Sequence, residues 1–165
     1  MTLSRDTLST ELQAMTPDAA TEAEGIARFA AAFENYFAES VVGLAPVVQS
    51  ALAPATAAME AAMAGVVAVD GGAGMYAGIA AFWGALPAIA PVVWPLVVPP
   101  LTTTVTPPPG LTTLQANITA VGVANIAGGL SLIDAADAMA TAIHAGTTGG
   151  TATNTATPPV AVPIL

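Results

Sequence analysis

The chain has 165 residues, of which 55% are hydrophobic and only 8% are charged, and its formal net charge is −9. Its only cations, Arg5 and Arg28, lie far apart in the sequence, which argues against binding to nucleic acid or to an anionic membrane surface. Without cysteine the chain can form neither a disulfide nor a catalytic thiolate, and its first residues lack the apolar stretch of a signal peptide.

Two amphipathic helices are predicted in the first 40 residues. Ser4 is placed to cap the first helix, and apolar residues at helical spacing continue it to Met15. The second helix opens with Thr16 as its cap, and Glu24 can pair with Arg28 one turn later. The apolar stripe of this second helix comprises Ile26, Phe29, Ala30, Phe33 and Phe37.

A third helix is predicted from about Pro54 to Val67. The preceding residues 41–48 contain Gly and Pro and are expected to turn the chain, whereas Asp70 and the two glycines after it are expected to end the helix. Methionines 59 and 63 fall on one face of this helix, and we interpret them as core filling rather than as a partner groove.

The fourth helix is expected to begin around Gly74 or Met75, inside an uncharged stretch that runs from residue 71 to 133. Glycines 74 and 78 leave one face smooth, so another helix can approach closely there. From Pro87 the helix should kink or end, because an interior proline costs roughly 3 kcal/mol. Its broad apolar face comprises Met75, Tyr76, Ile79, Phe82, Trp83 and Leu86.

A proline-rich strap at residues 87–110 is predicted to be extended chain that joins two helical halves. A fifth helix follows from Leu111 and fades at Asn125. Ser131 and Asp134 form a capping box for the sixth helix, which should end at Gly146. Residues 147–165 carry no charge and no helical period, so they are expected to form an extended arm.

The polar residues indicate no catalytic, cofactor-binding or metal site. His144 is the only histidine, no nucleophile motif accompanies it, and we interpret it as packing or as compensation of a helix dipole. Asp134 and Asp137 could contribute to a cation site, but capping of the first helical turn is the favoured interpretation. An enzyme, a cofactor and a small-molecule substrate are therefore not expected.

A membrane-inserting protein, such as a lysis or pore component, is the alternative. Residues 75–98 contain no charge, and as a continuous helix they would be about 36 Å long. Four prolines interrupt the segment and no Lys or Arg flanks it, which favours a buried helix followed by the strap. A soluble secreted helical module is a third interpretation.

Several short motifs are spread along the chain. They are Ala80-Ala-Phe-Trp-Gly-Ala85, Val93-Trp94, Thr106-Pro-Pro-Pro-Gly-Leu111, Leu130-Ser-Leu132, Ala142-Ile-His144-Ala145, Gly149-Gly150 and the Phe-Glu-Asn-Tyr-Phe segment at 33–37. Together these motifs resemble small Ala-rich proteins encoded among the virion genes of tailed bacteriophages and prophage-like tail particles. The resemblance implies a structural part of the tail, the baseplate or the head-to-tail region, and it assigns no catalytic residue.

The sequence thus predicts an all-α fold of five or six short helices, with a helical domain at residues 1–146 and an arm at 147–165. The expected function is that of a non-enzymatic virion subunit, assembled in the bacterial host cytoplasm through contacts with its own copies and with other virion proteins. Nucleic acid and membrane are not expected partners. The predicted interface residues are Met75, Ile79, Phe82, Trp83, Trp94, Val160, Val162, Ile164 and Leu165.

Overall fold

The computed structural model describes residues 4–15, 20–41, 46–67, 70–89, 103–154 and 160–163. These residues contain six helices, which confirms the helical fold class, together with three short strands. The helices are α1 (Arg5–Ala14), α2 (Glu22–Val41), α3 (Pro46–Met63), α4 (Gly71–Ile89), α5 (Leu111–Ile126) and α6 (Leu132–Thr147), and the strands are β1 (Thr103–Thr106), β2 (Thr151–Asn154) and β3 (Val160–Pro163).

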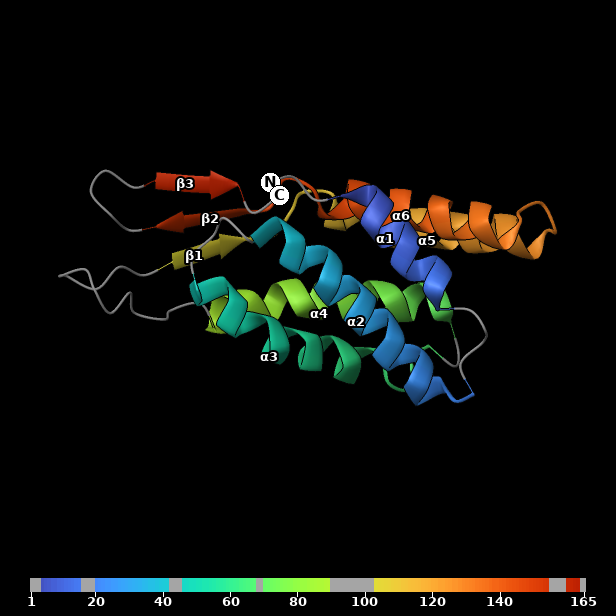
Figure 1. Cartoon of the computed structure of the whole chain (residues 1–165), viewed down its shortest axis with the longest axis horizontal. Helices are drawn as coiled ribbons and strands as arrows, with labels where there is room; N and C mark the ends of the chain where they lie inside the picture. Colours follow the sequence, from blue (N-terminus) through green and yellow to red (C-terminus); the bar gives the residue numbers. More distant parts are fainter. Residues whose placement is uncertain are drawn as a thin grey trace.

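Each helix packs on the next helix in the chain, and α6 returns to pack on α1. The six helices therefore form a closed ring of contacts. Figure 1 shows the three strands at one end of the molecule, whereas the turn between α5 and α6 projects beyond the other helices at the opposite end.

Aromatic side chains from α2 and α4 fill the centre of this ring. Phe33, Phe37, Phe82 and Trp83 have no exposed area. Their rings meet edge to face, with centroids 5.1 Å apart for Phe33 and Phe82, 5.0 Å for Phe37 and Phe82, and 5.3 Å for Phe37 and Trp83. The core thus joins the second and fourth helices across the ring.

Helix α3 begins at Pro46, so the expected start near Pro54 is wrong and residues 46–48 of the predicted turn are helical, whereas residues 42–45 of that turn lie outside the described residues. Pro54 lies inside the helix, where it removes one backbone hydrogen bond. The helix continues through it because Ala51, Leu52 and Ala55 are all buried in the core around this point. The helix ends at Met63, and Gly65 then adopts a φ of 79°, which a glycine tolerates without strain.

Helix α4 begins at Gly71, earlier than expected, because Asp70 starts this helix instead of ending the previous one. The Asp70 carboxylate accepts a hydrogen bond of 3.0 Å from the backbone N–H of Ala73, as an N-cap does. The helix then runs to Ile89, so that Pro87 falls in its last turn.

The N-terminal cap of α6 is confirmed, because Ser131 Oγ accepts a hydrogen bond of 3.2 Å from the backbone N–H of Asp134. The helix continues to Thr147, one residue past the expected end at Gly146. Gly146 instead lies close against α5, since a Cβ there would be 2.6 Å from Leu114 Cδ1. Gly149 takes the positive φ, 90°, that ends the helical segment.

The three strands form an antiparallel sheet in the order β1-β2-β3. Thr104 of β1 pairs with Thr153 of β2, and Ala152 of β2 pairs with Val162 of β3. A part of the predicted strap is therefore paired with two parts of the predicted arm in the same chain.

The close packing of α4 on α3 at Gly78 leads to a prediction about stability. A Cβ at Gly78 would lie 2.6 Å from Met63 Cγ and 3.1 Å from Met59 Cγ of α3, whereas a Cβ at Gly84 meets nothing within 4 Å. Gly78→Val should therefore lower the free energy of unfolding by about 1–3 kcal/mol, as overpacked cores do. Urea denaturation followed by circular dichroism measures this change.

The matched control is Gly84→Ala, which should leave stability unchanged or raise it by up to about 1 kcal/mol through helix propensity. Equal stability of the Gly78→Val variant and the unmodified chain would contradict the close contact between α3 and α4.

Candidate protein interaction surface

Large apolar side chains are exposed where α5 turns into α6. Val123, Ile126, Leu132 and Ile133, which we call the hairpin tip, are exposed by 62%, 88%, 60% and 63%. Among the residues whose side-chain exposure the structure describes, Val66 is the one other large hydrophobic residue that is exposed, by 37%. Gly128, with a φ of 79°, allows the tight turn between the two helices. Four exposed aliphatic residues at one end of a helical hairpin make this end a candidate interaction surface.

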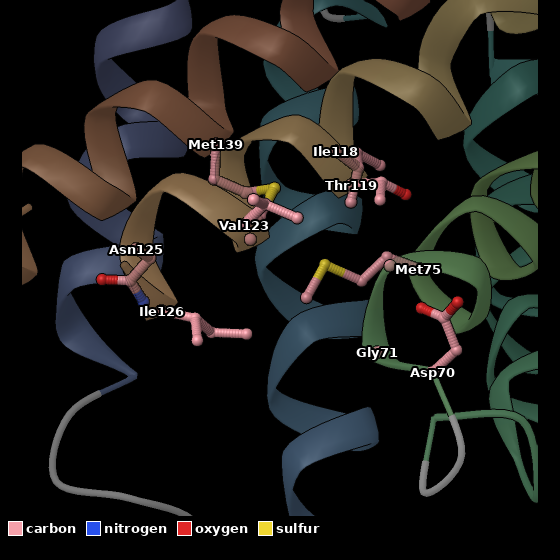
Figure 2. A pocket seen from close by; sticks show the side chains of 11 residues that line it. Asp70, Gly71, Met75, Ile118, Thr119, Val123, Asn125, Ile126 and Met139 are labelled. Carbon is pink, nitrogen blue, oxygen red and sulfur yellow. The ribbon is translucent and has the colours of Figure 1, made fainter. Parts of the chain in front are cut away.

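A hollow of about 520 Å³ lies beside the hairpin tip, between the start of α4 and the last turns of α5. We call it the α4–α5 hollow. Figure 2 shows Met75 on one side of it and Val123 and Ile126 on the other, with Asp70 at the rim. Its lining residues are Asp70, Gly71, Gly72, Met75, Ile118, Thr119, Gly122, Val123, Asn125, Ile126 and Met139.

Methionines line this end of the molecule. A second hollow, of about 330 Å³, is also lined by Met75 and is bordered by Met15, Met63, Ile26 and Phe29 among others. Four of the six methionines of the chain therefore line one of the two hollows. Because an unbranched thioether side chain adapts its shape at low cost, such a lining suits contact with another protein.

The carboxylates beside this surface lie at helix N-termini. Asp70 accepts from the Ala73 N–H at the start of α4, and Asp134 accepts from Ser131 Oγ, 2.6 Å away, in the first turn of α6. The positive end of the helix dipole partly compensates each charge. The surface is thus weakly charged, although the whole chain is strongly acidic.

Both arginines form ion pairs within the chain. Arg28 pairs with Glu24 on α2, as predicted from their spacing. Arg5 of α1 contacts Asp137 of α6 at 2.9 Å, and the other Asp137 oxygen accepts from Ser9 Oγ at 3.3 Å. Asp137 therefore holds α1 on α6. In the part of the chain that the structure describes, no group of three or more His, Cys, Asp or Glu side chains is placed to hold a metal ion.

His144 lies in a hydrogen-bonded cluster that ties α2 to α6. Its Nδ1 is 2.9 Å from the hydroxyl oxygen of Tyr36, which is 3.1 Å from Thr147 Oγ1. Thr147 in turn donates a bond of 2.8 Å to the carbonyl of Ile143. Burial raises the pKa of Tyr36 and lowers the pKa of His144, so both side chains are neutral near pH 7. The cluster acts as a structural connection between two helices.

The predicted interface residues of α4 separate into two groups. Met75 is half-buried and lines the α4–α5 hollow. Ile79, Phe82 and Trp83 have no exposed area, so the expectation that they contact another protein is corrected: they form the core of their own chain. The reason is that the face of α4 that bears them packs against the aromatic residues of α2.

The other predicted interface residues are near the C-terminus or in the strap. Val160 and Val162 belong to β3, whereas Trp94, Ile164 and Leu165 lie outside the described residues. Sequence reasoning missed the hairpin tip. The available signal was that Val123 and Ile126 fall off the buried stripe of α5, which includes Leu114 and Ile118.

The described helices include none that combines the length and the apolar character required to cross a membrane.

Comparisons of the chain with protein families, with curated proteins and with solved structures find no match. The resemblance to virion proteins stays a hypothesis. The function has to be inferred from the surface and from the sequence pattern.

The environment of His144 predicts a pH dependence of stability. Its pKa in the folded chain is below the ordinary value of 6.5, first because of burial and second because of Arg5. At a pH between the pKa of His144 in the folded chain and its higher pKa in the unfolded chain, the unfolded chain binds more protons. The free energy of unfolding should therefore fall as the pH drops below about 6.5. Chemical denaturation at several pH values between about 7.5 and 5.5 measures this, above the range in which most carboxylates titrate.

The control is His144→Gln, which retains a hydrogen-bonding side chain but does not titrate. We expect this variant to lose most of the pH dependence in that window. Identical pH profiles for the two chains would refute the assignment to His144.

Proposed function

We propose that the chain is a non-enzymatic structural subunit of a tailed bacteriophage or phage-tail-like particle, located in the tail, the baseplate or the head-to-tail region. The observation that carries this proposal is the exposed aliphatic hairpin tip beside a methionine-lined hollow. The short motifs named above supply the virion context. In this role the protein binds its own copies and other virion proteins, and it is incorporated during assembly in the host cytoplasm.

A role in assembly is also supported by the polar side chains of the helices, which are engaged in structural contacts. Asp70 and Asp134 cap helices beside the apolar end, Asp137 pairs with Arg5, and His144, at the other end of α6, is hydrogen-bonded to Tyr36. These polar groups stabilise the fold, which leaves the tip and its hollow to contact other proteins.

The strap and the arm supply a second contact region in this proposal. Strands from residues 103–106, 151–154 and 160–163 pair at the end of the molecule opposite the hairpin tip, as Figure 1 shows. The outer strands of a small sheet can accept a further strand from a neighbouring protein. A subunit with contact regions at both ends can be built into a ring or a stack.

The membrane-inserting alternative has less support. Of residues 75–98, the structure describes 75–89, which form most of α4. The side chains of Phe82 and Trp83 in this part are buried among the chain's own helices. Insertion into lipid would require these aromatic residues to leave the core. No observation on the described residues favours that rearrangement.

Mass spectrometry of purified particles tests the proposal. Phage or tail-like particles from the host that encodes the chain are banded on a density gradient and then banded again. We expect the chain to remain with the particles in constant proportion to the other virion proteins. An abundant host enzyme measured in the same fractions is the control and should be lost at the second step.

Recovery of the chain only in the free protein fraction or in the membrane fraction, while the other virion proteins band normally, would refute the structural role.

A further inference from the structure

We infer that the hairpin tip of one copy docks in the α4–α5 hollow of a second copy, and the reverse, so that two chains pair about a two-fold axis. The inference rests on the proposed structural role and names the partner of the apolar end. It concerns a contact between two copies of this chain, without a third component.

The shape of this end favours a second copy. The hairpin tip is a protrusion, and the α4–α5 hollow lies directly beside it, with Val123 and Ile126 forming both one wall of the hollow and part of the tip. A two-fold interface requires one surface to be complementary to itself. A protrusion next to a hollow meets this requirement, because rotation by half a turn places each protrusion over the other hollow.

The dimensions and the chemistry of the two parts agree. The hollow has a volume of about 520 Å³, within the range of about 300–1,000 Å³ in which proteins hold small ligands. It therefore has room for aliphatic side chains such as Ile126 and Leu132. Met75 and Met139 on its walls can adjust to the side chains that enter.

The hydrogen-bonding groups in the hollow can also pair with the same groups of a second copy. Asn125 and Thr119 line the hollow, and each carries both a hydrogen-bond donor and an acceptor. Across a two-fold axis, such groups pair without any charge.

Electrostatics selects this end for contact between copies. Each chain carries a net charge of −9, so two copies repel each other through most of their surfaces. Residues 71–133 contain no charged residue, and this stretch supplies most of the hollow and all four tip residues. Asp70, which lines the hollow, and Asp134, which follows Ile133 in the sequence, are partly compensated by helix N-termini. A basic partner would instead bind where acidic side chains are exposed.

The interface is small, because it consists of four tip residues and one hollow on each chain. Stable interfaces bury about 800 Å² on each partner, and smaller ones are typical of reversible association. We therefore expect a concentration-dependent equilibrium between monomer and dimer.

Light scattering and sedimentation velocity of the full-length chain test the inference. The main variant is Gly122→Gln, because a Cβ at Gly122 meets nothing within 4 Å and the longer side chain extends into the hollow. Replacing glycine inside a helix favours folding by up to about 1 kcal/mol, so unfolding cannot explain a loss of pairing. The matched control is Gly84→Gln, which also has open space but lies away from the hollow.

A second pair of variants tests the protrusion. Ile126→Glu places a charge on the tip, and Ala31→Glu places the same charge on an exposed position of α2. Circular dichroism verifies the helical content of all four variants.

The expected result is a mass that rises with concentration from one chain of 16.1 kDa toward two chains. Gly122→Gln and Ile126→Glu should remain at the mass of one chain, whereas both controls should pair like the unmodified chain. A chain that is monomeric at all concentrations would overturn the inference, and so would a dimer that all four variants still form.

These outcomes are separate from those of the particle experiment. A monomeric chain that remains with purified particles would overturn the pairing and leave the structural role standing. A chain that forms the dimer but is absent from the particles would support the pairing and overturn the structural role.

Discussion

The contact between the aromatic residues of α2 and those of α4 is the constraint on which the rest of the structure depends. Much of the apolar content of this chain is alanine and valine. Full burial of a Phe side chain contributes about 1.5–3 kcal/mol, against about 0.8 kcal/mol for a single methyl-sized group. Phe33, Phe37, Phe82 and Trp83 therefore dominate the stability of the ring of helices. The alanines and glycines serve a different purpose, since they let the neighbouring helices approach closely enough to enclose these rings.

The scarcity of charge shapes both the interior and the surface. Both arginines form ion pairs with acids of the same chain, and one pair, Arg5 with Asp137, joins the first helix to the last. Asp70 and Asp134 are positioned by helix termini rather than by cations. The charged residues thus organise the helices, and the four exposed residues of the hairpin tip carry no charge.

Local signals in the sequence predicted much of the fold. The caps at Ser4 and Ser131, the pair of Glu24 and Arg28, and the buried stripe of α2 were all correct, because each depends on residues within a few positions of one another. Asp70 was misread, since an acid before two glycines can either end one helix or begin the next. The link between Arg5 and Asp137 spans 132 residues and has no local signature. The interaction surface was missed for a related reason: only the packing of α5 and α6 decides which apolar residues remain outside.

The α5–α6 hairpin has a fixed base and an overhanging end. Near the base, Gly146 lies against Leu114, and His144 is bonded to Tyr36, so this part is joined to the central helices. The first turn of α6 and the last turns of α5 extend beyond the body, as Figure 1 shows. The hairpin therefore acts as a lever. A force on its overhanging end is transmitted to its base, where Tyr36 lies beside Phe33 of the aromatic core. A load from a neighbouring molecule would thus reach the centre of the protein as well as its surface.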